Sequence, residues 1–233
     1  MSRNFDPNLD ILMLAVVKLG KLTDEMVFLG GSTTGLLITD EASPPVRETK
    51  DVDAIVEVVT LAEYYKLSEK LRALGFNEDQ SEGAPLCRWV MEGVILDVMP
   101  TDSKILGFSN VWYPIAMKES VEYALPNETR IRVVTAPYFI ATKLEAFEGR
   151  GNGDYLASHD LEDLISVIDG RQEIIDEVLS SSEELKTYLK DKFSELLKSR
   201  AFLDALPGKL PGDESSQARI PIVIERIEKM IVS

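Results

Sequence analysis

The sequence has little of what crosslinks, exports or anchors a protein. Its only cysteine, Cys87, cannot form an internal disulfide, which favours a reducing location inside the cell. No apolar run approaches the roughly 20 residues that a membrane-spanning helix needs. The N-terminal residues Met1–Asp6 lack the basic region and the apolar stretch of a secretion signal. We therefore expect a cytoplasmic protein that has no membrane partner.

Positive charge is also scarce. The chain has 25 lysines and arginines against 40 acids, so its formal net charge is -15. Binding along a nucleic acid depends on neutralising phosphates with lysine and arginine, so this charge argues against a protein that coats nucleic acid through a broad basic surface. A local basic patch, a basic partner protein and a small-molecule substrate all remain compatible with this charge. The hydrophobic content of 45% is ordinary for a globular protein and suffices for a core.

The pattern of apolar residues changes along the chain, and its 233 residues suit one large domain or two small ones. We predict an α+β fold: a mixed β-sheet flanked by helices over residues 1–125, then a helical bundle over residues 126–233 that completes the active-site cleft. The predicted strands cover residues 26–29, 51–59, 86–91, 94–99 and 130–134. The predicted helices cover residues 8–20, 32–38, 60–74, 137–148, 160–168, 172–179, 182–198 and 215–231, and residues 40–50 are predicted to be an exposed loop.

Three carboxylates fall where neighbouring strands could bring them together. Asp51 and Asp53 open one strand and, two positions apart, point to the same face of it. Asp97 interrupts an otherwise apolar strand, and a buried carboxylate needs a cation or hydrogen-bond donors nearby. Mg²⁺ is the expected cation, because it takes one or two carboxylates and shares its other positions with substrate phosphates. The alternatives are a solvated strand edge for the first two acids, and a structural Asp97 bound by backbone amides.

A glycine turn precedes these acids. Gly30–Gly31–Ser32 follows the predicted strand over residues 26–29, and a backbone without Cβ atoms can approach a phosphate closely. The Ser32 hydroxyl could add a hydrogen bond. Taken alone, the same triplet also suits a tight turn that binds no ligand.

In this order, Gly31–Ser32, Asp51, Asp53 and Asp97 resemble the signature of the polymerase-beta-like nucleotidyltransferase superfamily. The resemblance covers about the first half of the chain. The interval between Ser32 and Asp51 is longer than in compact members, and we interpret the Pro44–Pro45 loop as an insertion.

The second half resembles the AbiEii/MenT group, nucleotidyltransferase toxins of toxin–antitoxin and abortive-infection systems. The resemblance lies in the Lys143–Leu144–Glu145–Ala146 helix, a downstream Arg150, and a second helix that starts near Asp160. It implies that Lys143 contacts the triphosphate and that Asp160 helps to organise the pocket. A snorkelling surface lysine and a first-turn helix acid are the plainer alternatives. His159 stands where members have an arginine, and neither His159 nor Arg150 is assigned a role.

The resemblance and the acids together predict metal-dependent nucleotidyl transfer. Asp51 and Asp53 would hold two Mg²⁺ ions about 3.5–4 Å apart, with Asp97 sharing one of them or acting as general base. Gly31, Ser32 and Lys143 would bind the phosphates of the NTP. The toxin group implies a tRNA acceptor and a cognate antitoxin protein. The alternatives are transfer to a small hydroxylated molecule such as an aminoglycoside, and a nucleotide-binding or partner-binding protein without turnover.

Overall fold

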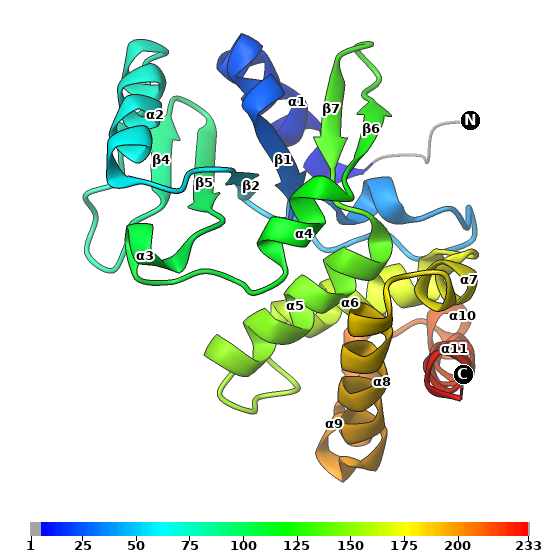
Figure 1. Cartoon of the computed structure of the whole chain (residues 1–233). Helices are drawn as coiled ribbons and strands as arrows, with labels where there is room; N and C mark the ends of the chain where they lie inside the picture. Colours follow the sequence, from blue (N-terminus) through cyan, green and yellow to red (C-terminus); the bar gives the residue numbers. More distant parts are fainter. Residues whose placement is uncertain (1–5, 233) are drawn as a thin grey trace. The chain divides into compact units, whose positions relative to one another are not determined.

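The computed structural model describes residues 6–232, so most of the N-terminal segment considered above lies outside the described residues. The chain forms two compact units, which are described separately (Figure 1). The sheet unit contains residues 6–33 and Glu48–Thr135, and the helical unit contains Thr34–Arg47 and residues 136–232. The boundary therefore differs from the expected division at residues 125/126. The strand Arg130–Val133 pairs with strands of the sheet, and Thr34–Arg47 groups with the helices.

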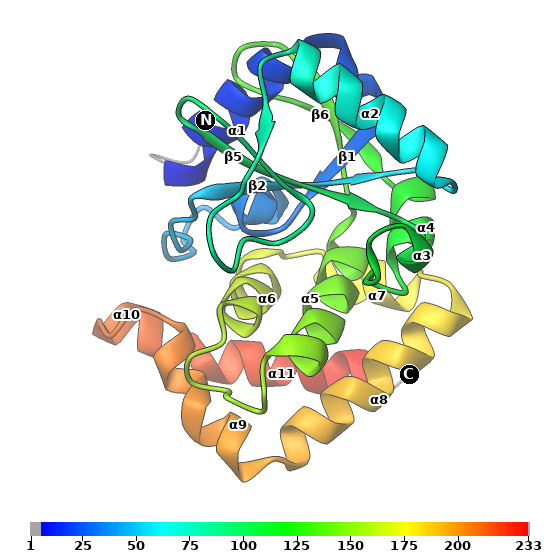
Figure 2. The same cartoon turned by 90° about the vertical axis from the view of Figure 1, so that its left-hand side faces the viewer.

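The predicted α+β fold is confirmed. The sheet unit holds a mixed seven-stranded sheet of order β3-β4-β5-β2-β1-β7-β6, in which the pairs β2–β5 and β1–β7 are parallel. Helix α1 (Pro7–Leu19) packs against β2 and β5, and Figure 2 shows α1 and α2 (Leu61–Ala73) together above the strands. The strands are β1 (Met26–Leu29), β2 (Asp51–Val56), β3 (Asn77–Glu78), β4 (Arg88–Met91), β5 (Val94–Pro100), β6 (Val121–Ala124) and β7 (Arg130–Val133).

Local sequence signals explain several of these elements. Thr60 and Glu63 form a capping box at the start of α2, because the side chain of each residue accepts a hydrogen bond from the backbone N–H of the other. Strands β4 and β5 form a hairpin around Glu92–Gly93, where Gly93 takes a φ of 75° that suits glycine. Both features agree with the sequence prediction.

Other elements differ from the prediction. The short helix after β1 is a 3₁₀ helix over Gly31–Leu37, so Ser32 lies inside it and does not cap it. Strand β2 ends at Val56, three residues earlier than expected. Strand β6 was not predicted, because all four of its residues are exposed and it has no buried face that would give an alternating pattern. The predicted final helix is two helices, α10 (Glu214–Gln217) and α11 (Ile220–Ile231).

The helical unit is built on α5 (Ala136–Arg150) and α6 (His159–Gly170), which pack against each other. Helix α8 (Glu183–Lys198) contacts α5, and α11 contacts α6 and α8. Short elements complete the unit: α7 (Ile174–Leu179), α9 (Arg200–Ala205) and the 3₁₀ helix Leu206–Lys209. The sheet unit also has the short helices α3 (Ser103–Leu106) and α4 (Tyr113–Lys118) and the 3₁₀ helix Gly20–Glu25. Within residues 6–232, no helix is long and apolar enough to span a membrane.

Residues 34–47, predicted as part of an exposed loop and its preceding helix, are bonded to the helices. The backbone N–H groups of Thr39 and Asp40 both donate to the carbonyl of Gly170 at the end of α6, at 2.9 and 2.8 Å. The Asp40 carboxylate also forms an ion pair with Arg219 at 2.5 Å. This segment is therefore an integral part of the helical unit.

Candidate active site

The three predicted acids meet on neighbouring strands of the sheet unit. Strands β2 and β5 run parallel in a register that sets Asp53 beside Asp97 and Asp51 beside Ile95. Because residues two apart share a face of a strand, Asp51 and Asp53 point to the same side of the sheet as Asp97. Asp97 is buried, while Asp51 and Asp53 are partly exposed. The register thus gathers the carboxylates at one place, open to solvent on the side of β2.

The glycine turn lies directly against this cluster. Gly30 has a φ of 76°, and a Cβ atom placed on it would lie 1.9 Å from Oδ2 of Asp53. Only glycine leaves room for that carboxylate. The hydroxyl of Ser32 is fully buried and has no hydrogen-bond partner among residues 6–232. A buried polar atom without a partner is costly, and a phosphate oxygen is one group that would satisfy it.

A cation from β4 lies among the carboxylates. Nε and Nη2 of Arg88 donate to the two carboxylate oxygens of Asp97, both at 2.8 Å, and Nη2 also donates to Oδ2 of Asp51 at 3.0 Å. The hydrogen bond and the charge of Asp97 together raise the pKa of the guanidinium above its ordinary value, so Arg88 stays protonated. Arg88 is not among the site residues predicted from the sequence. The sequence does contain a signal for Arg88 in the two-residue hairpin turn. If Met91 pairs with Val94, counting outward along both strands sets Arg88 opposite Asp97.

A buried amide ties the glycine turn to the strand that bears Asp51. Oδ1 of Asn8 accepts from the backbone N–H of Thr49 at 2.8 Å, and its Nδ2 donates to the Gly31 carbonyl at 3.3 Å. The Thr49 hydroxyl then donates to Oδ1 of Asp51 at 2.6 Å. Asn8 therefore fixes the turn and the start of β2 relative to each other. No pattern near Asn8 in the sequence indicates this role.

Cys87 lies next to the carboxylates but is unsuited to chemistry. Burial, with the negative charges of Asp97 and Asp53 as further causes, raises the pKa of its thiol to about 12. The neutral thiol is a poor nucleophile near pH 7. Cys87 is 3% exposed and acts as a small buried hydrophobic residue.

The carboxylates of the cluster suit a hard cation such as Mg²⁺, but the three acids are not placed to bind one ion together. Within residues 6–232, no three acidic, histidine or cysteine side chains are arranged to hold one metal ion. Asp97 has both oxygens on Arg88 and its side chain is only 10% exposed. Asp51 also accepts from Arg88 and from Thr49, but its side chain is 34% exposed, so Asp51 and Asp53 are the acids open to solvent. Mg²⁺ binds in proteins through one or two carboxylates plus water and substrate phosphates, so these two acids fit it. The role of Asp97 as a metal ligand remains a prediction.

Lys143 and Asp160 lie in the helical unit, in a buried ion network. Nζ of Lys143 donates to Oδ1 of Asp160 at 3.2 Å and to Oδ2 of Asp163 at 2.7 Å. Arg150 donates to both oxygens of Asp160, and Arg47 donates to Asp163. Lys143 is therefore no snorkelling surface lysine. The helix that starts at His159 is capped by Ser158, so Asp160 is a first-turn acid with two cationic partners.

The charge on Asp160 should stabilise this network. Burial disfavours its ionised form, but the bonds and charges of Arg150 and Lys143 outweigh burial and hold the pKa below its ordinary value. A lowered pKa means stabilisation that is complete above the unfolded-state pKa and lost as pH falls through the folded-state value. We expect Asp160→Asn to lower the free energy of unfolding by about 1.5–3 kcal/mol near neutral pH. The difference should shrink as the pH falls below 3.8 and disappear below the lowered folded-state pKa.

Urea unfolding of both proteins over a pH series measures this difference. The matched control is Asp191→Asn, which removes an exposed acid of α8 and should change stability by less than about 0.5 kcal/mol. A loss of stability that is the same at acidic and neutral pH would show that the charge of Asp160 is not its cause.

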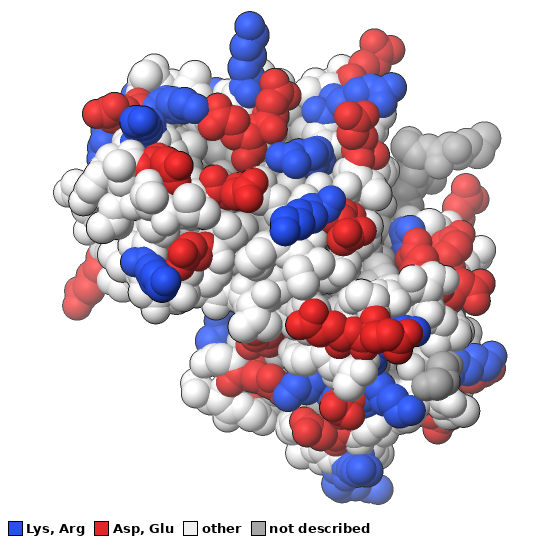
Figure 3. Space-filling model, in the orientation of Figure 1, with Lys and Arg blue, Asp and Glu red and all other residues white. Residues whose placement is uncertain are grey.

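Figure 3 shows how charge is distributed on one face of the molecule. On the face drawn in Figure 3, acidic and basic side chains are interspersed and no continuous basic area is visible. Any nucleic acid contact on this face would therefore be local.

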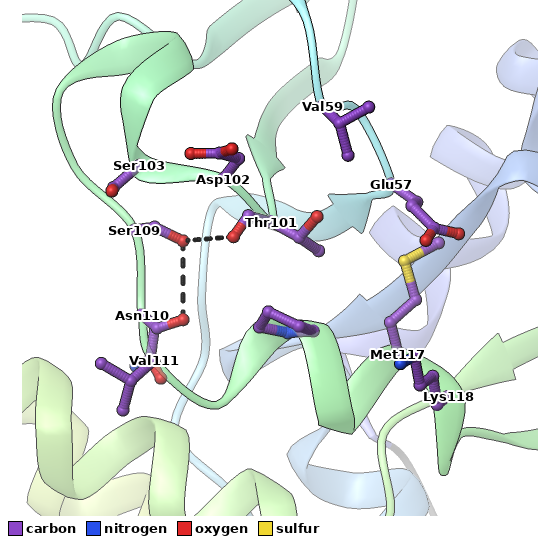
Figure 4. A pocket seen from close by; sticks show the side chains of 11 residues that line it. Glu57, Val59, Thr101, Asp102, Ser103, Ser109, Asn110, Val111, Met117 and Lys118 are labelled. Atoms are coloured by element: carbon purple, nitrogen blue, oxygen red, sulfur yellow. Dashed lines mark hydrogen bonds between the residues drawn. The ribbon is translucent and has the colours of Figure 1, made fainter.

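A cavity of about 580 Å³ lies at the carboxyl ends of β2 and β5 (Figure 4). Its wall includes Glu57, which is four residues beyond Asp53, and Thr101, which is four residues beyond Asp97. Four residues span roughly 13 Å along a strand. Ser109 donates to the Thr101 carbonyl at 3.2 Å and shapes one side of it. The remaining wall residues are Val59, Asp102, Ser103, Asn110, Val111, Pro114, Met117 and Lys118. The cavity is thus separate from the carboxylate cluster but lies on the same two strands.

Comparisons with known proteins leave the activity to be argued from the site. No protein-family model and no curated protein matches the chain. Among solved structures, it is similar to JHP933 from Helicobacter pylori, with 14% identity, a TM-score of 0.49, and coverage of 96% of this chain and 90% of that one. It is also similar to a proposed nucleotidyltransferase from H. pylori, with 14% identity, a TM-score of 0.48, and coverage of 97% and 94%.

Proposed function

We propose that this protein is a metal-dependent nucleotidyltransferase, which moves an NMP from an NTP to an acceptor. The observation that carries the proposal is the register of β2 and β5, which sets Asp53 beside Asp97, with the Gly30 turn against the Asp53 carboxylate. The buried Ser32 hydroxyl, which has no partner within residues 6–232, supports a phosphate site at that turn.

In this proposal, some residues of the site bind the metal ion and others bind the phosphates. Asp51 and Asp53 would hold Mg²⁺ on the open side of the cluster. When bound, the ion would shield the charge of the phosphates and lower the pKa of the acceptor hydroxyl. Gly31 and Ser32 would donate to phosphate oxygens, and Asn8 would keep their turn in place against β2. Asp97 would act as the general base that accepts the proton of the acceptor hydroxyl. Each of its oxygens already accepts from Arg88, so it would use a second lone pair of one oxygen.

The more specific part of the proposal is a cytoplasmic toxin that acts on tRNA and is controlled by a cognate antitoxin. Its support is the pattern of Lys143, Arg150, Asp160 and Asp163, which form one ion network in the helical unit. In this proposal, Lys143 contacts the triphosphate and Asp160 holds Lys143 in place.

A second candidate acceptor is a small hydroxylated molecule such as an aminoglycoside. The observation that favours it is the cavity beyond Asp53, whose wall carries the carboxylates of Glu57 and Asp102. Carboxylates suit a polycationic acceptor, because each can accept hydrogen bonds from an ammonium group. A protein that binds nucleotide or a partner without turnover is the third candidate.

A labelling experiment distinguishes these candidates. The purified protein is incubated with Mg²⁺ and each of the four α-³²P-labelled NTPs, together with total RNA or a panel of aminoglycosides. Label on RNA in the tRNA size range is the expected result, and label on an aminoglycoside would favour the second acceptor. Binding of an NTP without transfer would indicate the non-catalytic candidate. Neither binding nor transfer of any NTP would refute the proposed function.

A further inference from the structure

Arg88 has no role in the proposed function, although its side chain lies within the carboxylate cluster. Its guanidinium makes a two-pronged contact with Asp97 and a third hydrogen bond to Asp51. These bonds use Nε and Nη2, and the structure gives Nη1 no acceptor within residues 6–232. The side chain is 22% exposed, so it is held in place without being sealed from solvent. The two N–H groups of Nη1 are therefore the donors of Arg88 that bind no group within residues 6–232.

The charges of the cluster also give Arg88 a place in the chemistry. Three carboxylates and one guanidinium leave two net negative charges, which one divalent ion balances. A second ion on Asp97 would have to compete with a fixed cation that occupies both of its oxygens, whereas Arg88 bonds only Oδ2 of Asp51. Mg²⁺ requires near-ideal octahedral geometry. A carboxylate whose two oxygens are held by a bidentate guanidinium contact is poorly oriented to be one of its ligands.

We propose that Arg88 is a phosphate-binding residue of this active site. Asp97 holds the guanidinium through Nε and Nη2, and the free Nη1 donates to an oxygen of the nucleotide triphosphate. Asp51 and Asp53 are then the protein ligands of a single divalent ion, and Asp97 is a positioning residue. This inference rests on the proposed nucleotidyl transfer and assigns one more contact in the same site.

The chemistry of arginine suits this position. Its planar guanidinium has five N–H donors in a fixed fork, so one edge can bind a carboxylate while another binds an oxyanion. A lysine at position 88 would keep the charge but could not hold two oxygens of Asp97 and a phosphate with the same geometry. The charge and the fork can therefore be tested separately with Arg88→Gln and Arg88→Lys.

The experiment measures two ligands that do not depend on turnover. Mn²⁺ alone is titrated and counted by electron paramagnetic resonance, and tripolyphosphate is titrated by calorimetry in the presence of Mg²⁺. The wild-type protein should bind one Mn²⁺ in the sheet unit. Arg88→Gln should weaken tripolyphosphate binding about 10- to 100-fold and tighten Mn²⁺ binding by about tenfold. Arg88→Lys should keep the Mn²⁺ affinity and lose part of the phosphate affinity.

Asp97→Asn separates a positioning residue from a metal ligand. It should weaken tripolyphosphate binding about as much as Arg88→Gln, and the double variant should be no weaker than either, because both changes remove one contact. It should still bind one Mn²⁺. The matched control is Arg130→Gln, which removes an exposed arginine of the same unit and should change neither titration.

The outcomes are distinguishable. Tripolyphosphate binding that is unchanged in Arg88→Gln, or Mn²⁺ binding that is lost in Asp97→Asn, would overturn the inference and leave the proposed function standing. A wild-type protein that binds neither Mn²⁺ nor tripolyphosphate would overturn the proposed function itself. Circular dichroism and the melting temperature of each variant show whether it is folded, and Arg88→Lys remains informative if Arg88→Gln is not.

Discussion

Asp53→Asn should reduce nucleotidyl transfer by about 1,000-fold or more. Asp53 lies beside Asp97 across β2 and β5 and faces the glycine turn, so it is the acid common to the proposed metal and phosphate sites. A bound ion stabilises the transition state by several kcal/mol, and each 1.36 kcal/mol is a factor of ten in rate. Asparagine has nearly the same shape and carries no charge. The variant should therefore fold, lose Mn²⁺ binding and lose turnover.

Transfer rates, Mn²⁺ titration and thermal unfolding test this expectation together. The control is Asp24→Asn, the same change at an exposed acid of the sheet unit. Activity of Asp53→Asn within tenfold of the wild type would show that the carboxylate cluster is not the catalytic centre. A large fall in melting temperature would instead assign Asp53 a role in folding.

Gly30→Ala should both destabilise the protein and abolish transfer. Its φ of 76° lies in the left-handed region, where a Cβ atom costs about 1–2 kcal/mol. The new Cβ atom would also lie 1.9 Å from Oδ2 of Asp53, so the carboxylate or the turn must move. Forcing an extra carbon into a packed site costs a further 1–3 kcal/mol, approximately. Displacement of Asp53 should remove Mn²⁺ binding as well.

Gly83→Ala is the matched control for this change. Gly83 has a φ of 82°, but a Cβ atom on it would meet nothing within 4 Å. It should therefore show the backbone cost alone, about 1–2 kcal/mol, with normal Mn²⁺ binding and transfer. Urea unfolding of both variants gives the difference that belongs to the contact with Asp53. Equal destabilisation of the two, with activity retained in Gly30→Ala, would contradict the assigned role of the turn.

The parts of the fold that local signals determine could be predicted from the sequence. The capping box of Thr60 and Glu63 marks the start of α2, and the four buried residues from Met26 to Leu29 mark β1. The hairpin turn at Glu92–Gly93 fixes the pairing of β4 with β5. That pairing also sets Arg88 opposite Asp97, so the partner of this acid could have been found by counting outward from the turn.

Long-range pairing could not be predicted in the same way. No turn links β2 to β5, so nothing local in the sequence sets Asp53 beside Asp97. The strand pattern showed only that the two acids could meet, and the register that pairs them comes from the fold. The membership of residues 34–47 in the helical unit depends on bonds to Gly170 and Arg219, which are far away in the sequence. Asn8 is similar, because its two partners, Gly31 and Thr49, come together only in the folded chain.

The interrupted course of the chain has a practical consequence for anyone who dissects this protein. Within residues 6–232 the polypeptide changes units after Thr33, after Arg47 and after Thr135, so neither half can be excised as one continuous fragment. A truncation at Thr135 would strand Thr39 and Asp40 without the Gly170 carbonyl that accepts their N–H groups. If the protein is divided into two fragments, they would have to be co-expressed and reassembled. The fragment that contains residues 34–47 should also contain Gly30 and Asp51, which flank this segment in the chain.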